Sequence, residues 1–212
     1  MLLNDWASLA IICMLGAFSP GPSLIVILSL TSTDGRRSGY DASLGHGCGI
    51  FVYAFMSASG LAIILNLHKG LFALIQFLGA IFLLYLGLRI MRSIIFKASE
   101  ESSKSVLNQN YSNRFTDGFL IAILNPKIAV FFLSLFSQFL RLEQNFIIHL
   151  GMATLAGVID TVAYVLMVSL ASTQIMLKFL STYKTSVEFC FGLLLIALSI
   201  SLSAKILIDY FY

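Results

Sequence analysis

Two short proline motifs give this chain sites at which helices can break inside apolar runs. The motif SPGPS covers Ser19–Ser23, and the motif NPK covers Asn125–Lys127. Proline removes a backbone donor and obstructs the carbonyl four residues earlier, so neither motif fits a continuous helix. A half-helix that begins at such a break has free amides and the positive end of its dipole. Both features favour binding of a carboxylate or another anion.

The residues expected to form this anion site belong to the two motifs. Ser19 and Asn125 precede the prolines at equivalent positions, and both residue types can cap the half-helix that follows. A packing kink without a site is the simpler interpretation, but two related breaks, one beside a lysine, favour a binding site. The candidate substrate-binding residues are Ser19, Pro20, Gly21, Pro22, Asn125, Pro126 and Lys127.

Lys127 and Asp160 place charges inside two different apolar runs. A charge at the centre of a membrane helix costs about 2.5–3.5 kcal/mol, so each should be paired, hydrated or neutral. Lys127 could attract a substrate carboxylate, whereas Asp160 could bind an ammonium group or carry a coupling proton. The sequence leaves open whether the two form a structural ion bridge. His46, between glycines in LGHGCG, is expected to make an interhelical hydrogen bond, although imidazole could also titrate near neutrality.

The composition requires that the elements holding these residues lie in lipid. Hydrophobic residues make up 58% of the 212 residues and charged residues only 11%, against roughly 45–50% and about 25% in soluble globular proteins. A soluble fold of this size lacks the interior volume for so much apolar side chain. The sequence therefore predicts an all-α polytopic membrane protein. Its net charge of +3 does not indicate nucleic-acid binding, because the basic residues lie in short gaps between apolar runs.

Six apolar stretches reach the length of about 20 residues that a transmembrane helix needs. They are 6–33, 42–68, 70–88, 115–139, 146–172 and 184–207. The first should remain in the mature protein, because it has no basic region before it and no small-residue cleavage site after it. With six spans, nine lysines and arginines fall on one side and three on the other. This excess predicts that the basic side is cytoplasmic and that both termini lie outside.

Similar features recur at an offset of 106 residues, the distance between Pro20 and Pro126. Each of these prolines is followed 25 residues later by a glycine, Gly45 or Gly151. Each half then has three predicted helices, and an odd number gives the halves opposite orientations. Inverted repeats whose first helix is interrupted, here predicted helices 1 and 4, are typical of secondary transporters. The predicted parts of this single membrane domain are a first three-helix repeat at 1–95, a cytoplasmic linker at 96–114 and a second three-helix repeat at 115–212.

Taken together, these motifs resemble the LysE/RhtB family of bacterial amino-acid exporters over nearly the whole chain. The matching stretches are Ser19–Ser23, Gly35–Gly49, Phe115–Phe132, Ser137–Phe139 and Asp160–Tyr164. The resemblance implies a compact exporter in the bacterial inner membrane that moves amino acids or close derivatives out of the cell, driven by the proton gradient. The family's motif positions fall on Pro20, Gly21, Pro22, Asn125, Pro126, Lys127 and Asp160.

Other classes of function are less well supported by the residues. A membrane enzyme would need a nucleophile, a base or metal ligands at defined spacings, and the chain contains neither HExxH nor GxSxG. Cys13, Cys48 and Cys190 lie too far apart in sequence for a CxxC-type redox or metal site. A cation or heavy-metal exporter of similar architecture remains the alternative, although a fixed positive charge at Lys127 would repel a cation.

The expected partners are an amino-acid substrate, protons as coupling ion and the lipid bilayer, with no nucleic acid, metal or cofactor. The sequence does not choose the amino acid or the oligomeric state. A homo-oligomer stays open, because the glycine-lined second and fifth spans could pack within one chain or between two.

Overall fold

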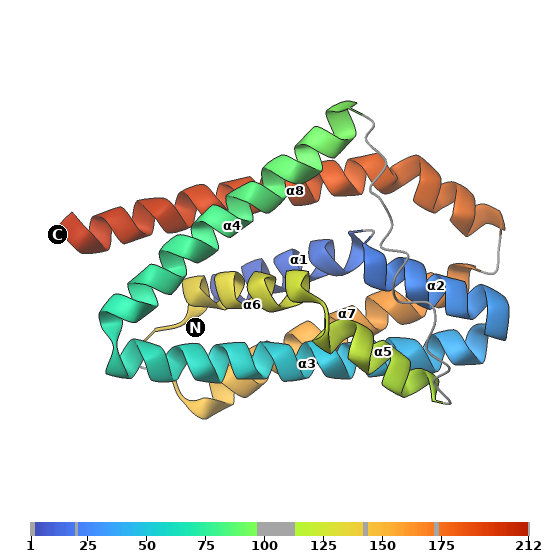
Figure 1. Ribbon diagram of the computed structural model, residues 1–212, viewed down its shortest axis with the longest axis horizontal. Coiled ribbons are helices and arrows are strands. Elements are labelled where there is room, and N and C mark those ends of the chain that lie inside the picture. Colours follow the sequence, from blue (N-terminus) through green and yellow to red (C-terminus); the bar gives the residue numbers. More distant parts are fainter. Residues whose placement is uncertain (1–2, 20, 97–112, 142–143, 172–173, 212) are drawn as a thin grey trace.

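The computed structural model describes residues 3–19, 21–96, 113–141, 144–171 and 174–211. Within these ranges the chain forms eight α-helices and no strand (Figure 1). The helices are α1 (Leu3–Phe18), α2 (Pro22–Asp34), α3 (Arg36–Leu67), α4 (Lys69–Phe96), α5 (Arg114–Ile123), α6 (Pro126–Phe139), α7 (Phe146–Ala171) and α8 (Gln174–Phe211). The predicted all-α class is confirmed. Pro20 and most of the predicted linker, residues 97–112, lie outside the described residues.

Both predicted helix breaks are present. The axes of α1 and α2 differ by 55°, and those of α5 and α6 differ by 58°. The second helix of each pair begins with a proline, Pro22 or Pro126. Proline suits this position because its fixed φ matches a helix and its missing N–H would have no partner within the first turn. A proline of each motif therefore begins the helix that follows the break.

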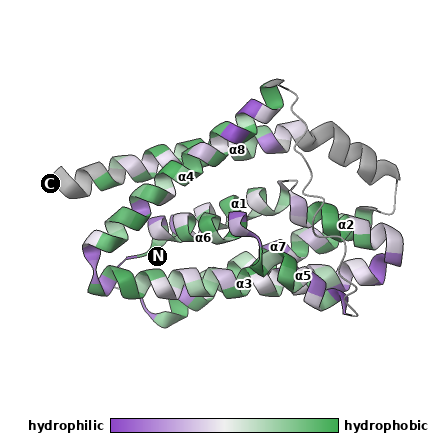
Figure 2. Cartoon of the chain, in the orientation of Figure 1, coloured by the Kyte–Doolittle hydropathy of each residue, from purple (hydrophilic) through white to green (hydrophobic). Residues whose placement is uncertain are grey.

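Several helices have the length and apolar character of membrane spans. In the described part of the chain, α3, α4 and α7 qualify alone, and each broken pair qualifies as one bent unit. The apolar part of α8, Glu188–Ala204, is shorter. Large apolar side chains such as Met56, Phe77 and Leu193 are about half exposed or more. Figure 2 shows hydrophobic residues along α3 and α4. The chain is thus a polytopic α-helical membrane protein, and six remains the predicted number of spans.

The order of elements occurs twice, since a broken pair is followed by two long helices in α1–α4 and again in α5–α8. Figure 1 shows that α1 and α2 run opposite to α5 and α6, and that α3 runs opposite to α7. The two sets are interleaved: α3 packs on α5 and α7, and α4 packs on α8. This order and direction support the predicted inverted repeat.

Ion pairs join the two broken units at both ends of the fold. At one end Arg114, which begins α5, pairs with Asp34, which ends α2. Arg114 also donates to Asp117 over 2.9 Å. At the other end Arg141, just after α6, lies 3.2 Å from the carboxylate of Asp5 in α1. Each pair therefore connects the start of one broken unit with the end of the other.

Glycines allow α3 to approach its neighbours closely. A Cβ added at Gly45 would overlap the carbonyl oxygen of Phe115 in α5, and one at Gly118 would overlap the carbonyl oxygen of Ala42 in α3. On the opposite side, a Cβ at Gly47 would overlap the Thr161 hydroxyl of α7. The glycine-lined second and fifth predicted spans therefore pack against each other within one chain.

We expect Gly45→Ala to destabilise the folded protein by about 1–3 kcal/mol, the usual cost of forcing an extra carbon into a packed interior. The obstructing atom is backbone, which cannot turn aside as a side chain could. Thermal unfolding in detergent would show this as a lower midpoint. Gly60→Ala is the matched control on the same helix, because a Cβ there has no neighbour within 4 Å. Equal midpoints for the two variants would contradict the close-packing argument.

Candidate functional site

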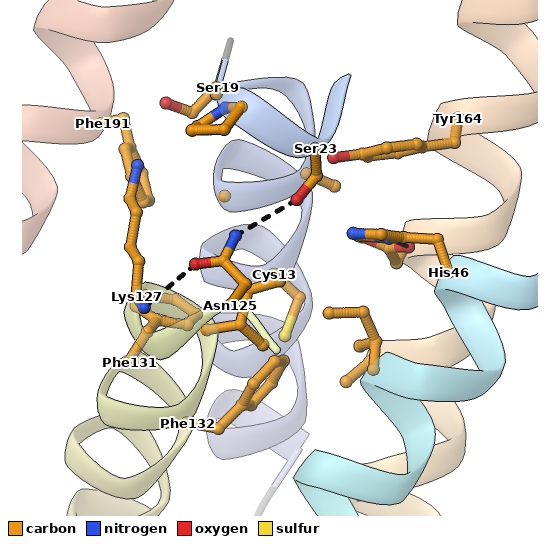
Figure 3. Close-up of a pocket in the computed structure, with 18 residues that line it drawn as sticks. Cys13, Ser19, Ser23, His46, Asn125, Lys127, Phe131, Phe132, Tyr164 and Phe191 are labelled. Carbon is orange, nitrogen blue, oxygen red and sulfur yellow. Dashed lines mark hydrogen bonds and ion pairs between the residues drawn. The ribbon is translucent and has the colours of Figure 1, made fainter. Parts of the chain in front are cut away.

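A central cavity of about 90 Å³ lies where the two helix breaks meet. Its walls come from α1, α2, α3, α6, α7 and α8 (Figure 3). Of the predicted site residues, those that line it are Ser19, Gly21, Pro22, Asn125, Lys127 and Asp160. Pro126 starts α6 beside the cavity without lining it, and Pro20 lies outside the described residues. The fold therefore brings together residues from both motifs and from the fifth predicted span.

The two half-helices begin differently at the cavity. Asn125 caps α6, because its Oδ1 accepts from the backbone N–H of Lys127 at 3.0 Å. Its amide also donates to the hydroxyl of Ser23 in α2 at 3.2 Å, which links the two breaks. The cap of α2 is Gly21, which makes no side-chain cap bond. The first amides of α2 therefore keep their capacity to bind an anion.

The prediction that Ser19 caps the second half-helix is wrong. Its backbone N–H instead donates to the carbonyl of Leu15 at 3.0 Å, which extends the hydrogen-bonding of α1. The physical reason is the second proline of the motif. Pro22 starts α2, so the capping position falls on Gly21, two residues after Ser19. The Asn125 motif has one proline directly after the asparagine, and its predicted cap is confirmed.

Lys127 brings a positive charge to the uncapped start of α2. Its side chain extends from α6 along the cavity wall (Figure 3), and a Cβ added at Gly21 would lie 4.0 Å from its Nζ. The ammonium group and the positive end of the α2 dipole thus act on the same space. Both features favour an anion there.

A buried histidine–aspartate pair forms another wall of the cavity. His46 Nδ1 lies 2.7 Å from Oδ2 of Asp160, and His46 is only 1% exposed. The ring stacks on Tyr164 with a centroid distance of 4.5 Å. Figure 3 shows the Tyr164 hydroxyl directed toward Ser23 and shows His46 across the cavity from Lys127. The expected interhelical hydrogen bond of His46 is therefore confirmed, with Asp160 as its partner.

The rest of the cavity wall is largely apolar. Phe131 meets Phe132 edge-on with centroids 5.4 Å apart, and it contacts Phe191 of α8 at 6.2 Å. Ile50 and Ile128 also line the space. An ammonium on one side, an imidazole–carboxylate pair on the other and an apolar wall can together hold a small molecule that carries both charges and an apolar group.

Sequence reasoning missed several lining residues, among them Cys13, Ser23, Tyr164 and the three phenylalanines. Ser23 belongs to the SPGPS motif, and Tyr164 follows Asp160 by one helical turn, so both carried a usable signal. No comparable pattern marks Cys13, whose thiol is buried. Among the described residues, no group of three histidine, cysteine, aspartate or glutamate side chains is arranged to hold a metal ion.

Comparisons with known proteins place these features in a family. The profile of the LysE type translocator matches residues 14–205. The leucine efflux proteins of Salmonella choleraesuis and Salmonella typhi are each 29% identical to the chain over 141 residues, which are 66% of this chain and 64% of theirs. The match thus spans slightly less than two thirds of their length. An uncharacterized membrane protein of Haemophilus influenzae is 28% identical over 192 residues, 89% of each chain.

No solved structure matches the chain significantly. The family match and the apolar helices together indicate a bacterial membrane protein. Because the profile covers most of the chain and nearly every residue that lines the central cavity, the chain belongs to the LysE type translocator family.

Proposed function

We propose that this protein exports α-amino acids with uncharged, apolar side chains, and that protons entering the cell drive the export. One observation carries the proposal: the cavity sets the Lys127 ammonium and the start of α2 across from the His46–Asp160 pair. An amino acid at neutral pH has the complementary charges, a carboxylate and an ammonium group. The carboxylate would lie at Lys127 and α2, and the ammonium group at His46 and Asp160.

The apolar wall supports the choice of side chain. Phe131, Phe132 and Phe191 offer a surface without charge, which suits a branched aliphatic group and would leave a charged one without a partner. The Salmonella relatives are named leucine efflux proteins, which agrees with this choice. The cavity of about 90 Å³ is smaller than the roughly 150 Å³ cavity that accepts benzene. Leucine would therefore bind only as the surrounding helices move apart, as a transporter that alternates between two openings requires.

A metal cation suits the same cavity poorly. Lys127 would repel it, and Asp160 already accepts from His46. Hard divalent ions bind to several oxygen ligands, and the cavity offers one carboxylate. An amino acid would be attracted by both Lys127 and Asp160, whereas a metal cation would be repelled by Lys127.

The proposal predicts selective efflux from liposomes that contain the purified protein. The liposomes are loaded with the twenty amino acids at equal concentration, and the outside is made acidic. Mass spectrometry then follows which amino acids leave. We expect leucine and other branched aliphatic amino acids to leave faster than lysine, aspartate or glycine, and faster than from protein-free liposomes. Loss of no amino acid above the protein-free rate, with the protein folded, would overturn the proposal.

A further inference from the structure

We propose that His46 Nε2 is the atom that takes up the coupling proton, and that the proton and the substrate ammonium group compete for it. This inference rests on the proposed function and assigns the coupling step within the same cavity. His46 is 1% exposed and lines the cavity. Its Nδ1 is bonded to Asp160, but Nε2 has no hydrogen-bond partner among the described residues. Buried polar atoms nearly always have a partner, so an unpartnered nitrogen at a cavity is a candidate contact for a ligand.

The partner of Nδ1 determines the chemistry of Nε2. An ionised carboxylate can only accept hydrogen bonds, so the 2.7 Å contact with Asp160 requires a hydrogen on Nδ1. In the neutral ring Nε2 then carries a lone pair. Stacking on Tyr164 holds the ring in this orientation. Asp160 therefore acts as a positioning residue that keeps a lone pair on Nε2, which can accept a proton or a hydrogen bond.

Two ligands suit this lone pair, and they exclude each other. A proton that enters from outside adds to Nε2 and gives an imidazolium ion, whose charge Asp160 neutralises. The ammonium group of an amino acid can instead donate to Nε2 of the neutral ring. It cannot do so once Nε2 is protonated, because both groups are then donors and both are positive. Arrival of the amino acid from the cytoplasm thus requires that Nε2 release its proton to water on the cytoplasmic side, and no covalent bond other than N–H forms or breaks.

The titratable groups around His46 are compatible with this exchange. Asp160 and Tyr164 face it from α7, Lys127 lies across the cavity on α6, and Cys13 lines the cavity from α1. The part of α2 that lines the cavity has Ser23 as its polar side chain, and that side chain is uncharged. On α5, Arg114 and Asp117 are paired with each other, and α4 begins only after the far end of α3. Asp160 is therefore the acidic group in direct contact with the ring.

The test compares two histidines that are both buried. Glutamine at position 46 keeps a hydrogen bond to Asp160 but takes up no proton between about pH 5 and 8, where imidazole does. We expect His46→Gln to lose at least tenfold in leucine efflux driven by an acidic exterior. Leucine–leucine exchange without a pH gradient should persist at a reduced rate and lose its dependence on pH. His149→Gln is the control, since His149 is 7% exposed and lies outside the cavity lining, and both activities should match the wild type.

The outcomes separate this inference from the proposed function. Absence of exchange in the wild type would overturn the proposed function itself. If the wild-type protein exchanges leucine and His46→Gln shows gradient-driven efflux at the wild-type rate, the role of His46 is overturned while the proposed function stands. A second measurement needs no variant: leucine added to the wild-type protein in weakly buffered detergent near pH 6.5 should release protons. Binding of leucine without proton release would overturn the competition, even if His46→Gln failed to fold.

Discussion

Replacing Lys127 with methionine should reduce leucine efflux to the rate of protein-free liposomes while the protein stays folded. Methionine keeps an unbranched apolar stem like that of lysine but removes the charge that lies next to Gly21. Leaving one member of a buried charged pair without its partner costs about 2–5 kcal/mol, which corresponds to at least about a thirtyfold loss of affinity at 1.4 kcal/mol per factor of ten. Efflux from proteoliposomes and direct leucine binding in detergent would both measure the loss.

Two further variants decide whether the charge or the position matters. Lys127→Arg keeps the charge but replaces a compact ammonium with a planar guanidinium, so we expect partial activity. Lys69→Met removes a lysine that is exposed at the start of α4, far from the cavity lining, and should export at the wild-type rate. Wild-type export from Lys127→Met would reduce this residue to a packing role and would remove the carboxylate site from the proposal.

The helix breaks and most membrane spans could be predicted from sequence because they depend on local physics. Apolar length marks a span, and proline marks a break whatever surrounds it. Hydropathy did not predict where the helices end. The helix α4 continues through Arg89 and Arg92 to Phe96, although the apolar stretch was expected to end near residue 88. A helix need not break where it leaves the lipid, because its hydrogen bonds are satisfied internally on both sides of the boundary.

The site could be predicted as a set of residues but not as a set of contacts. Asn125 was identified as a cap because the cap lies one residue from its helix. The sequence alone does not identify the partner of Asp160, and the structure pairs it with His46, 114 residues away. Such a contact depends on how α3 packs against α7. The close approach of these helices at Gly47 and Gly157 depends on tertiary structure, and no local pattern fixes which side chains then face each other.

Asp160→Asn should abolish net export driven by a pH gradient. Asparagine has nearly the shape of aspartate, so the contact with His46 can persist, but its amide can donate to Nδ1 as well as accept. The hydrogen of the ring can then move to Nε2, which removes the lone pair from the cavity, and a protonated ring would lose its counter-charge. In serine proteases, where an aspartate likewise orients a histidine, the same substitution lowers kcat by about 10⁴. We expect at least a tenfold loss of gradient-driven efflux in proteoliposomes.

Asp117→Asn is the matched control, because Asp117 is also buried but contacts Arg114 instead of the cavity. It should retain efflux with the wild-type dependence on the pH gradient. The same dependence in Asp160→Asn would show that Asp160 has no part in coupling. Loss of gradient-driven efflux in Asp160→Asn but not in His46→Gln would place the proton on the carboxylate. Loss in both, together with pH-independent exchange in His46→Gln, requires a proton on the imidazole and an aspartate that orients it.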